Sequence, residues 1–73
     1  MDLVIKAGSK LVRLGGTVFR REDFRRVEVS PRKSLFDVIV YLDENQYAYV
    51  ATFKQEVSAV EVVARIYEVL SIP

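Results

Sequence analysis

The chain has no cysteine and no histidine among its 73 residues. The absence of cysteine removes disulfides and thiolate chemistry. The absence of histidine removes the commonest general base and, together with the missing thiolates, the best ligands for transition metals. Catalysis is therefore the function class with the least support, and we expect a protein that is not an enzyme and that holds no metal or other cofactor.

Long apolar runs are missing as well. A helix that spans a membrane needs about 18 consecutive apolar residues, and no stretch of the sequence approaches that length. The first residues, from Met1 to Lys6, have neither the basic start nor the long apolar region of a signal peptide. We expect a cytoplasmic protein that does not enter a membrane, which agrees with the lack of cysteine.

Glycine and proline are scarce, with three and two residues, and no linker, repeat or low-complexity tract divides the chain. A chain of this length has room for one hydrophobic core. The composition, 51% hydrophobic and 29% charged, is typical of a globular domain. The sequence therefore predicts one domain over residues 1–73.

Residues 36–53 have the pattern of a β-hairpin around which the rest of the chain is organised. Every second residue from Phe36 to Leu42 is apolar, which places these side chains on one face of a strand. The polar residues 43–46 predict a turn, and the two-residue period resumes in residues 46–53. Two such runs separated by a turn predict antiparallel strands.

The opposite face of this hairpin is apolar too, because it carries Ile39 and Tyr41. Beside them must lie either the alternating set that begins at Tyr47 and includes Tyr49, or the set that begins at Ala48. The outer face of a small antiparallel sheet is usually hydrophilic, so this one predicts either a second layer formed by the N-terminal strands or a subunit interface. Since tyrosine suits interfaces, the candidate interface residues here are Ile39, Tyr41, Tyr47 and Tyr49.

Asp37 is the one carboxylate inside the apolar strand. Two interpretations are open: burial raises its pKa and gives it an acid–base role, or it pairs with an arginine of the neighbouring strand. The acidic turn at Asp43 and Glu44 lacks the spacing of a calcium-binding loop. We assign no catalytic and no metal-binding residue.

The C-terminal segment predicts a helix. Ser58 and Glu61 have the spacing of a capping box, although a start near Gln55 is an alternative, and Pro73 stops the chain beyond the last apolar residue. The apolar residues recur at helical spacing and are expected to face the sheet: Ala59, Val60, Val63, Ile66, Tyr67 and Leu70.

Val62 and Val69 fall outside this expected apolar face. A helix that covers one sheet needs an apolar stripe only a little wider than about 100°, so the two valines are in excess. Either the chain itself covers them or they tolerate water, or they form a subunit interface, because small chains often complete a thin core by associating.

The N-terminal half predicts further strands. Gly15 and Gly16 separate two short apolar runs, which indicates a hairpin turn with positive φ at both positions. One helical turn is expected to place Phe24 in the core before a short strand at residues 27–29, and residues 30–34 are expected to form a loop. The whole pattern predicts an α+β fold, with one antiparallel sheet of about four or five strands and one C-terminal helix packed across one face.

Charge is distributed unevenly along the chain. Residues 1–34 hold nine lysines and arginines against four acids, a net charge of +5, whereas residues 35–73 hold two against six, a net charge of −4. A basic surface of this kind attracts anions such as nucleic acid. Glu22 and Asp23 oppose this interpretation because they neutralise part of the cluster, and no nucleic-acid-binding motif is present. The candidate anion-binding residues are Arg20, Arg21, Arg25, Arg26, Arg32 and Lys33.

These observations favour a small non-enzymatic protein that binds another macromolecule, in a protein-interaction or regulatory role. Its expected partners are a second copy of the chain, in a homodimer or larger homo-oligomer, and other proteins. The alternative is a nucleic-acid-binding protein that uses the arginine-rich segment from Arg20 to Lys33.

Overall fold

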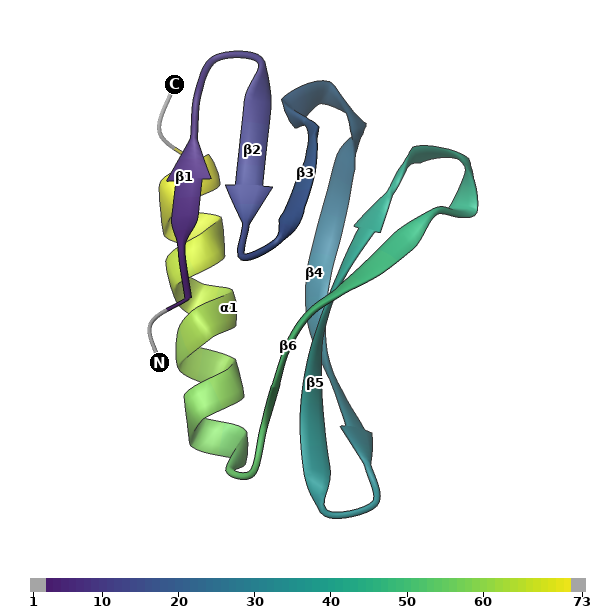
Figure 1. The fold of residues 1–73 in the computed structure, drawn as a ribbon, viewed down its shortest axis with the longest axis vertical. Coiled ribbons are helices and arrows are strands. Elements are labelled where there is room, and N and C mark those ends of the chain that lie inside the picture. The colour runs from purple at the N-terminus through teal and green to yellow at the C-terminus, as the bar shows by residue number, and fades with distance from the viewer. Residues whose placement is uncertain (1–2, 72–73) are drawn as a thin grey trace.

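The computed structural model describes residues 3–71 (Figure 1), so that the expected stop at Pro73 lies outside the described residues. The described residues form six strands and one α-helix. In chain order these are β1 (Ile5–Ala7), β2 (Leu11–Leu14), β3 (Thr17–Arg20), β4 (Phe24–Arg32), β5 (Leu35–Leu42), β6 (Tyr47–Phe53) and α1 (Glu56–Leu70).

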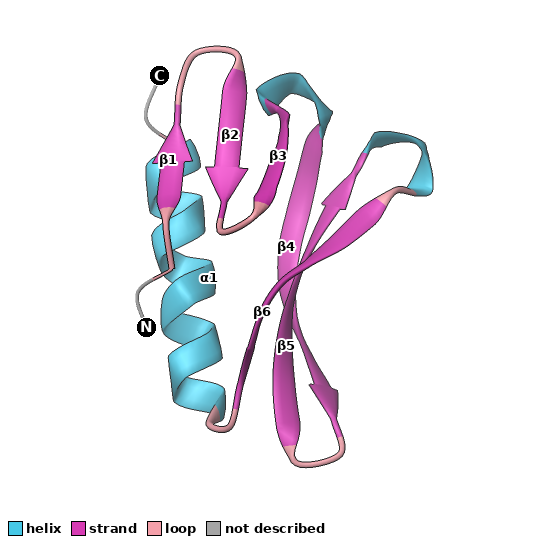
Figure 2. Ribbon diagram, viewed as in Figure 1, coloured by secondary structure: helices cyan, strands magenta, loops and turns pink. Residues whose placement is uncertain are grey.

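The strands form two antiparallel sheets, with the orders β1-β2-β3 and β4-β5-β6. The α+β class and the single C-terminal helix are confirmed, but the expectation of one sheet of four or five strands is wrong. A 3₁₀ turn at Arg21–Asp23 redirects the chain after β3 (Figure 2). The N–H of Arg21 donates to the Lys10 carbonyl at 2.8 Å and holds this turn against the start of β2. Strand β4 therefore leaves the first sheet and starts the second.

Three turn and strand assignments differ in detail from expectation. In the β2–β3 hairpin only Gly15 has a positive φ, of 62°, and a Cβ there would lie 2.9 Å from the Leu3 side chain. The helical turn precedes Phe24, which begins β4. Strand β4 continues through Pro31 to Arg32, because β4 is an edge strand and an edge strand tolerates a residue without an N–H.

Both sheets and the helix contribute to one core. The buried apolar side chains are Val12, Leu14 and Phe19 from the first sheet, Val27, Val38 and Val40 from the second, and Ala59 and Ile66 from α1. The expected inner face of β5, with Val38 and Val40 in the core and Phe36 and Leu42 packed against it, is thus confirmed. Over residues 3–71 no helix has the length and apolar character that crossing a membrane requires.

Helix α1 begins earlier and is rotated relative to the prediction. Its N-cap is Gln55, so the early start is correct and the capping box at Ser58 is wrong. Val62, expected outside the apolar face, packs against the core, whereas Val60, expected to face the sheet, is exposed. Tyr67 is partly exposed but does reach the second sheet, where its hydroxyl bonds the backbone of Val27. The cause is that α1 contacts β1 as well as β4, β5 and β6, so two sheets, not one, determine which side of the helix is buried.

Candidate interaction surface

A β-bulge in β6 decides which side chains reach the outer face of the second sheet. Val38 pairs with Ala51, but the next residue, Ile39, pairs with Tyr49, which leaves Val50 as the extra residue. The side chains of β6 before Val50 therefore alternate between the two faces of the sheet in the opposite phase to those after it. Neither of the two alternating sets expected for this strand is therefore found whole.

The bulge brings three tyrosines together on the outer face of the second sheet. Tyr41 pairs with Tyr47 across β5 and β6, and Ile39 pairs with Tyr49. The ring centroids of Tyr41 and Tyr47 are 6.2 Å apart, and those of Tyr47 and Tyr49 are 6.1 Å apart. On the other side of Tyr41, the guanidinium carbon of Arg26 lies 4.2 Å from the ring centroid, in cation–π geometry. We call this surface, formed by Arg26, Ile39, Tyr41, Tyr47 and Tyr49, the tyrosine face.

Exposure differs sharply within the tyrosine face. Tyr47 and Tyr49 are 60% and 57% exposed, whereas Ile39, which pairs with Tyr49, is only 5% exposed. Helix α1 shares the core with Val38 and Val40, which point to the opposite side of the sheet. Large side chains of the sheet itself thus shield Ile39, and among residues 3–71 no helix lies over this face (Figure 1).

Asp37 lies in the same outer face and is fully enclosed by polar partners. The Arg32 guanidinium donates from Nε to Oδ2 at 2.9 Å and from Nη2 to Oδ1 at 3.3 Å, and the Thr52 hydroxyl donates to Oδ1 at 2.7 Å. The hydrogen bonds from Arg32, and then from Thr52, hold the pKa of Asp37 below its usual range despite burial. The interpretation of a raised pKa is wrong, and pairing with an arginine of the neighbouring strand is what the structure contains.

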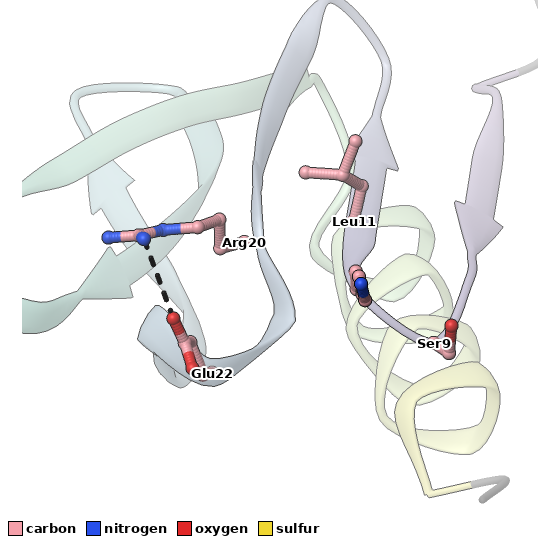
Figure 3. A pocket seen from close by; sticks show the side chains of 5 residues that line it. Ser9, Leu11, Arg20 and Glu22 are labelled. Carbon is pink, nitrogen blue, oxygen red and sulfur yellow. Dashed lines mark ion pairs between the residues drawn. The ribbon is translucent and has the colours of Figure 1, made fainter.

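The basic residues of β3 and the following turn have intramolecular partners. Arg20 forms ion pairs with Glu22 at 3.5 Å and with Asp23 at 3.3 Å. Figure 3 shows Arg20 directed toward Glu22 at the edge of a shallow hollow that Leu11 also lines. Lys10 also lines the hollow, but Glu22 and Asp23 balance the charges of Lys10 and Arg20, so this hollow offers little net positive charge to an anion.

Arg21 holds two distant segments together. Its Nη1 donates to the Gly8 carbonyl at 3.0 Å, and its Nη2 donates to the Leu70 carbonyl at 2.6 Å. The second bond places a cation at the C-terminus of α1, where the unpaired carbonyls and the helix dipole favour positive charge. Arg21 therefore has a structural role that its place in a charged run did not reveal.

The basic residues of β4 are spread along the strand. Arg25 pairs with Asp43, and the Nε of Arg26 pairs with Glu28 at 2.6 Å. Arg32 pairs with Asp37 about 20 Å farther along the strand from Arg26, six residues at the usual rise per residue. The six candidate anion-binding residues thus do not converge on one site, and only Arg26 belongs to the tyrosine face.

The remaining predicted site residues are Lys33, for anion binding, and Val62 and Val69 of α1, for a subunit interface. Lys33 is exposed in the β4–β5 turn with a φ of 56°, and none of the ion pairs within residues 3–71 includes it. Val62 packs against the core, and Val69 is half-buried. The exposed valines of α1 are Val57 and Val60, which the sequence pattern assigned to no interface.

No protein-family model matches the chain, and no curated protein or solved structure is significantly similar to it. Its function is therefore inferred from its own surface.

Proposed function

We propose that the chain is a small cytoplasmic, non-enzymatic protein-interaction module that self-associates through the tyrosine face. The observation that supports this most directly is the exposure of Tyr47 and Tyr49 beside the shielded Ile39. Tyrosine and arginine are enriched among the residues that dominate binding energy, and such residues lie around a centre from which water is excluded. A second copy of the chain would cover the rings of Tyr47 and Tyr49 and exclude water from them.

The charges on the outer face of the second sheet, around the tyrosine face, favour a second copy over a polyanion. Arg26 is paired with Glu28 and Arg32 with Asp37, so each of these two cations on the outer face already has a carboxylate partner. Two such surfaces are compatible, because the half-exposed Arg26 and Glu28 of one copy can meet Glu28 and Arg26 of the other. Nucleic acid would instead need cations without acidic neighbours.

The experiment is light scattering after size exclusion, at several protein concentrations. We expect the wild-type chain to have at least twice the monomer mass, and the double variant Tyr47→Ser with Tyr49→Ser to have the monomer mass. The matched control is Leu11→Ser with Val18→Ser, because these residues are equally exposed, at 56% and 58%, but lie in the first sheet. A control variant that dissociates as readily as the tyrosine variant would contradict the proposal, and so would a monomeric wild type.

The same samples test the nucleic-acid alternative. A mixed pool of single- and double-stranded oligonucleotides is added at low and at moderate salt. Exposed tyrosines stack on bases, and phosphate contacts weaken steeply as salt rises. A complex that forms only at low salt and is lost in the tyrosine variant would replace self-association by nucleic-acid binding as the function of this face.

A further inference from the structure

We infer that α1 carries a second interaction surface, separate from the tyrosine face, whose partner is an amphipathic helix with a basic polar face. The surface is formed by Val57, Val60, Ala64 and Tyr67, which we call the valine stripe. These residues are exposed, with Val57 at 58%, Val60 at 51% and Tyr67 at 43%. Their spacing of three or four residues aligns them along one side of the helix, over about 15 Å.

Of the valine stripe only Tyr67 touches the margin of the core, through Phe24 and Val27 of β4. Val60 follows Ala59, which is fully buried, and successive residues of a helix point about 100° apart. Val57 lies farther still from the buried side of α1. The helix is thus apolar on two sides, of which only one is used by the two sheets. A surface helix that serves its own fold alone needs one apolar side.

Carboxylates border the stripe along its length. Glu61 and Glu68 lie one turn after Val57 and Ala64, and Glu56 lies one turn before Val60. All three are exposed, and no ion pair or hydrogen bond within residues 3–71 involves their carboxylates. Arg65 lies one turn from both Glu61 and Glu68 without a described ion pair, so three carboxylates and one arginine give this side of α1 a net negative charge. The stripe is therefore complementary to a partner that combines an apolar face with lysine or arginine.

The backbone groups on the edge of β4, next to the stripe, favour a helix over an added strand as the partner. The Tyr67 hydroxyl occupies both the N–H and the carbonyl of Val27 in β4. Pro31, on the same edge, has no N–H to offer. An added strand would need these groups, whereas a helix satisfies its own backbone and needs only side-chain contact. The ridge of residues at helical spacing is the shape against which another helix packs.

A second copy of α1 is a poor occupant of the stripe. Two copies placed side by side would bring together two helix surfaces that each hold Glu56, Glu61 and Glu68 against Arg65, and surfaces of the same net charge oppose association. The surface around the tyrosine face has no such excess of negative charge, because Arg26 is paired with Glu28 and Arg32 with Asp37. The two surfaces therefore differ in the partner that they accept.

The test uses two synthetic amphipathic helices of equal length with the same leucine face, one with lysines and the other with glutamates on the polar face. Binding to the isotope-labelled chain is followed by amide chemical shifts. We expect the lysine helix to bind, with shifts concentrated in α1, and the glutamate helix not to bind. The variant Val57→Ser with Val60→Ser should weaken binding by at least about tenfold, and the control Leu11→Ser with Val18→Ser should leave it unchanged.

A second variant separates charge from apolar contact. Glu61→Gln with Glu68→Gln keeps both valines, and we expect it to weaken binding of the lysine helix and to reduce the dependence of that binding on salt. The inference is overturned if the lysine helix fails to bind, if both helices bind equally, or if the valine variant binds like the wild type. It is also overturned if the valine variant alone changes the mass of the unliganded protein, because a second copy would then occupy the stripe.

Discussion

The hydroxyl of Tyr67 accepts a hydrogen bond from the Val27 N–H at 3.1 Å and donates one to the Val27 carbonyl at 3.3 Å. Both groups point away from β5, because the N–H and the carbonyl of one strand residue lie on the same side. Strand β4 is an edge of its sheet, and unpaired groups on an edge invite pairing with other chains. The Tyr67 side chain of α1 thus satisfies these two backbone groups, so that they are not available to another strand.

Tyr67→Phe removes both hydrogen bonds and keeps the ring. We expect the free energy of unfolding to fall by about 1 to 2 kcal/mol, because two hydrogen bonds are lost and two backbone groups are left without a protein partner. Urea denaturation measures the loss, and the Val27 amide should exchange its hydrogen faster. Tyr47→Phe is the control, since the hydroxyl of Tyr47 is exposed and has no described hydrogen bond. Equal losses in the two variants would contradict the assigned role.

The buried Asp37 makes stability depend on pH in the acid range. Hydrogen bonds from Arg32 and Thr52 lower its folded pKa, so the unfolded chain takes up this proton at a higher pH than the folded chain. The stabilisation is complete above the unfolded pKa of about 3.9 and is lost as the pH falls through the folded pKa. Urea denaturation at a series of pH values should show the difference in stability between the wild type and Asp37→Asn shrinking below about pH 4.

Arg32→Ala tests the cause of that dependence. Because the hydrogen bond from Arg32 is the largest contribution to the lowered pKa, its removal should raise the pKa of Asp37. The acid-dependent loss of stability should then be smaller than in the wild type and be complete at a higher pH, because the folded pKa moves toward the unfolded one. The same pH window in both proteins would show that Arg32 does not control this carboxylate.

Glu44 lies at the tip of the β5–β6 hairpin in a left-handed conformation, with a φ of 59°, and Asn45 follows with a φ of 61°. Such a conformation costs a residue with a side chain about 1 to 2 kcal/mol, and glycine avoids most of this cost. We expect Glu44→Gly to raise the free energy of unfolding by up to about 1 kcal/mol. Gln46→Gly, at a φ of −82°, should lower it by about 0.4 to 1 kcal/mol, because only the unfolded chain gains freedom. Thermal or urea denaturation of both variants checks the opposite signs.

Arg21 and Arg20 are neighbours in the sequence with different environments. Arg21→Ala should lower the free energy of unfolding by about 1 kcal/mol, because the Leu70 carbonyl at the end of α1 loses its cationic donor. Arg20→Ala should change it by less than about 0.5 kcal/mol, since its ion pairs with Glu22 and Asp23 are exposed. Faster amide exchange in the last turn of α1 should accompany the first variant only. A larger effect from Arg20 would refute this assignment.

The elements that the sequence predicted best are those in which side-chain periodicity and secondary structure coincide. The alternation from Phe36 to Leu42 became β5, and the helical spacing after Gln55 became α1. The two glycines became a hairpin turn. These features depend on neighbours within a few residues, so local geometry and the need to bury one face determine them.

The candidate surface depended on relationships that no local pattern contains. The bulge at Val50 placed Tyr47 and Tyr49 on the outer face, while Phe53 remained on the core side. A bulge is stable only through its partner strand, and the two-residue period of β6 alone does not reveal it.

The sequence by itself determined the α+β class, the β5–β6 hairpin, the C-terminal helix and the lack of cysteine and histidine chemistry, because these follow from composition and short-range periodicity. Only the tertiary structure decided that there are two sheets, that α1 buries Val62 and exposes Val60, and that Arg21 serves the end of α1. Each of these depends on which distant segment lies opposite a side chain. That choice is made by the packing of the whole core and by the pairing of charges across it.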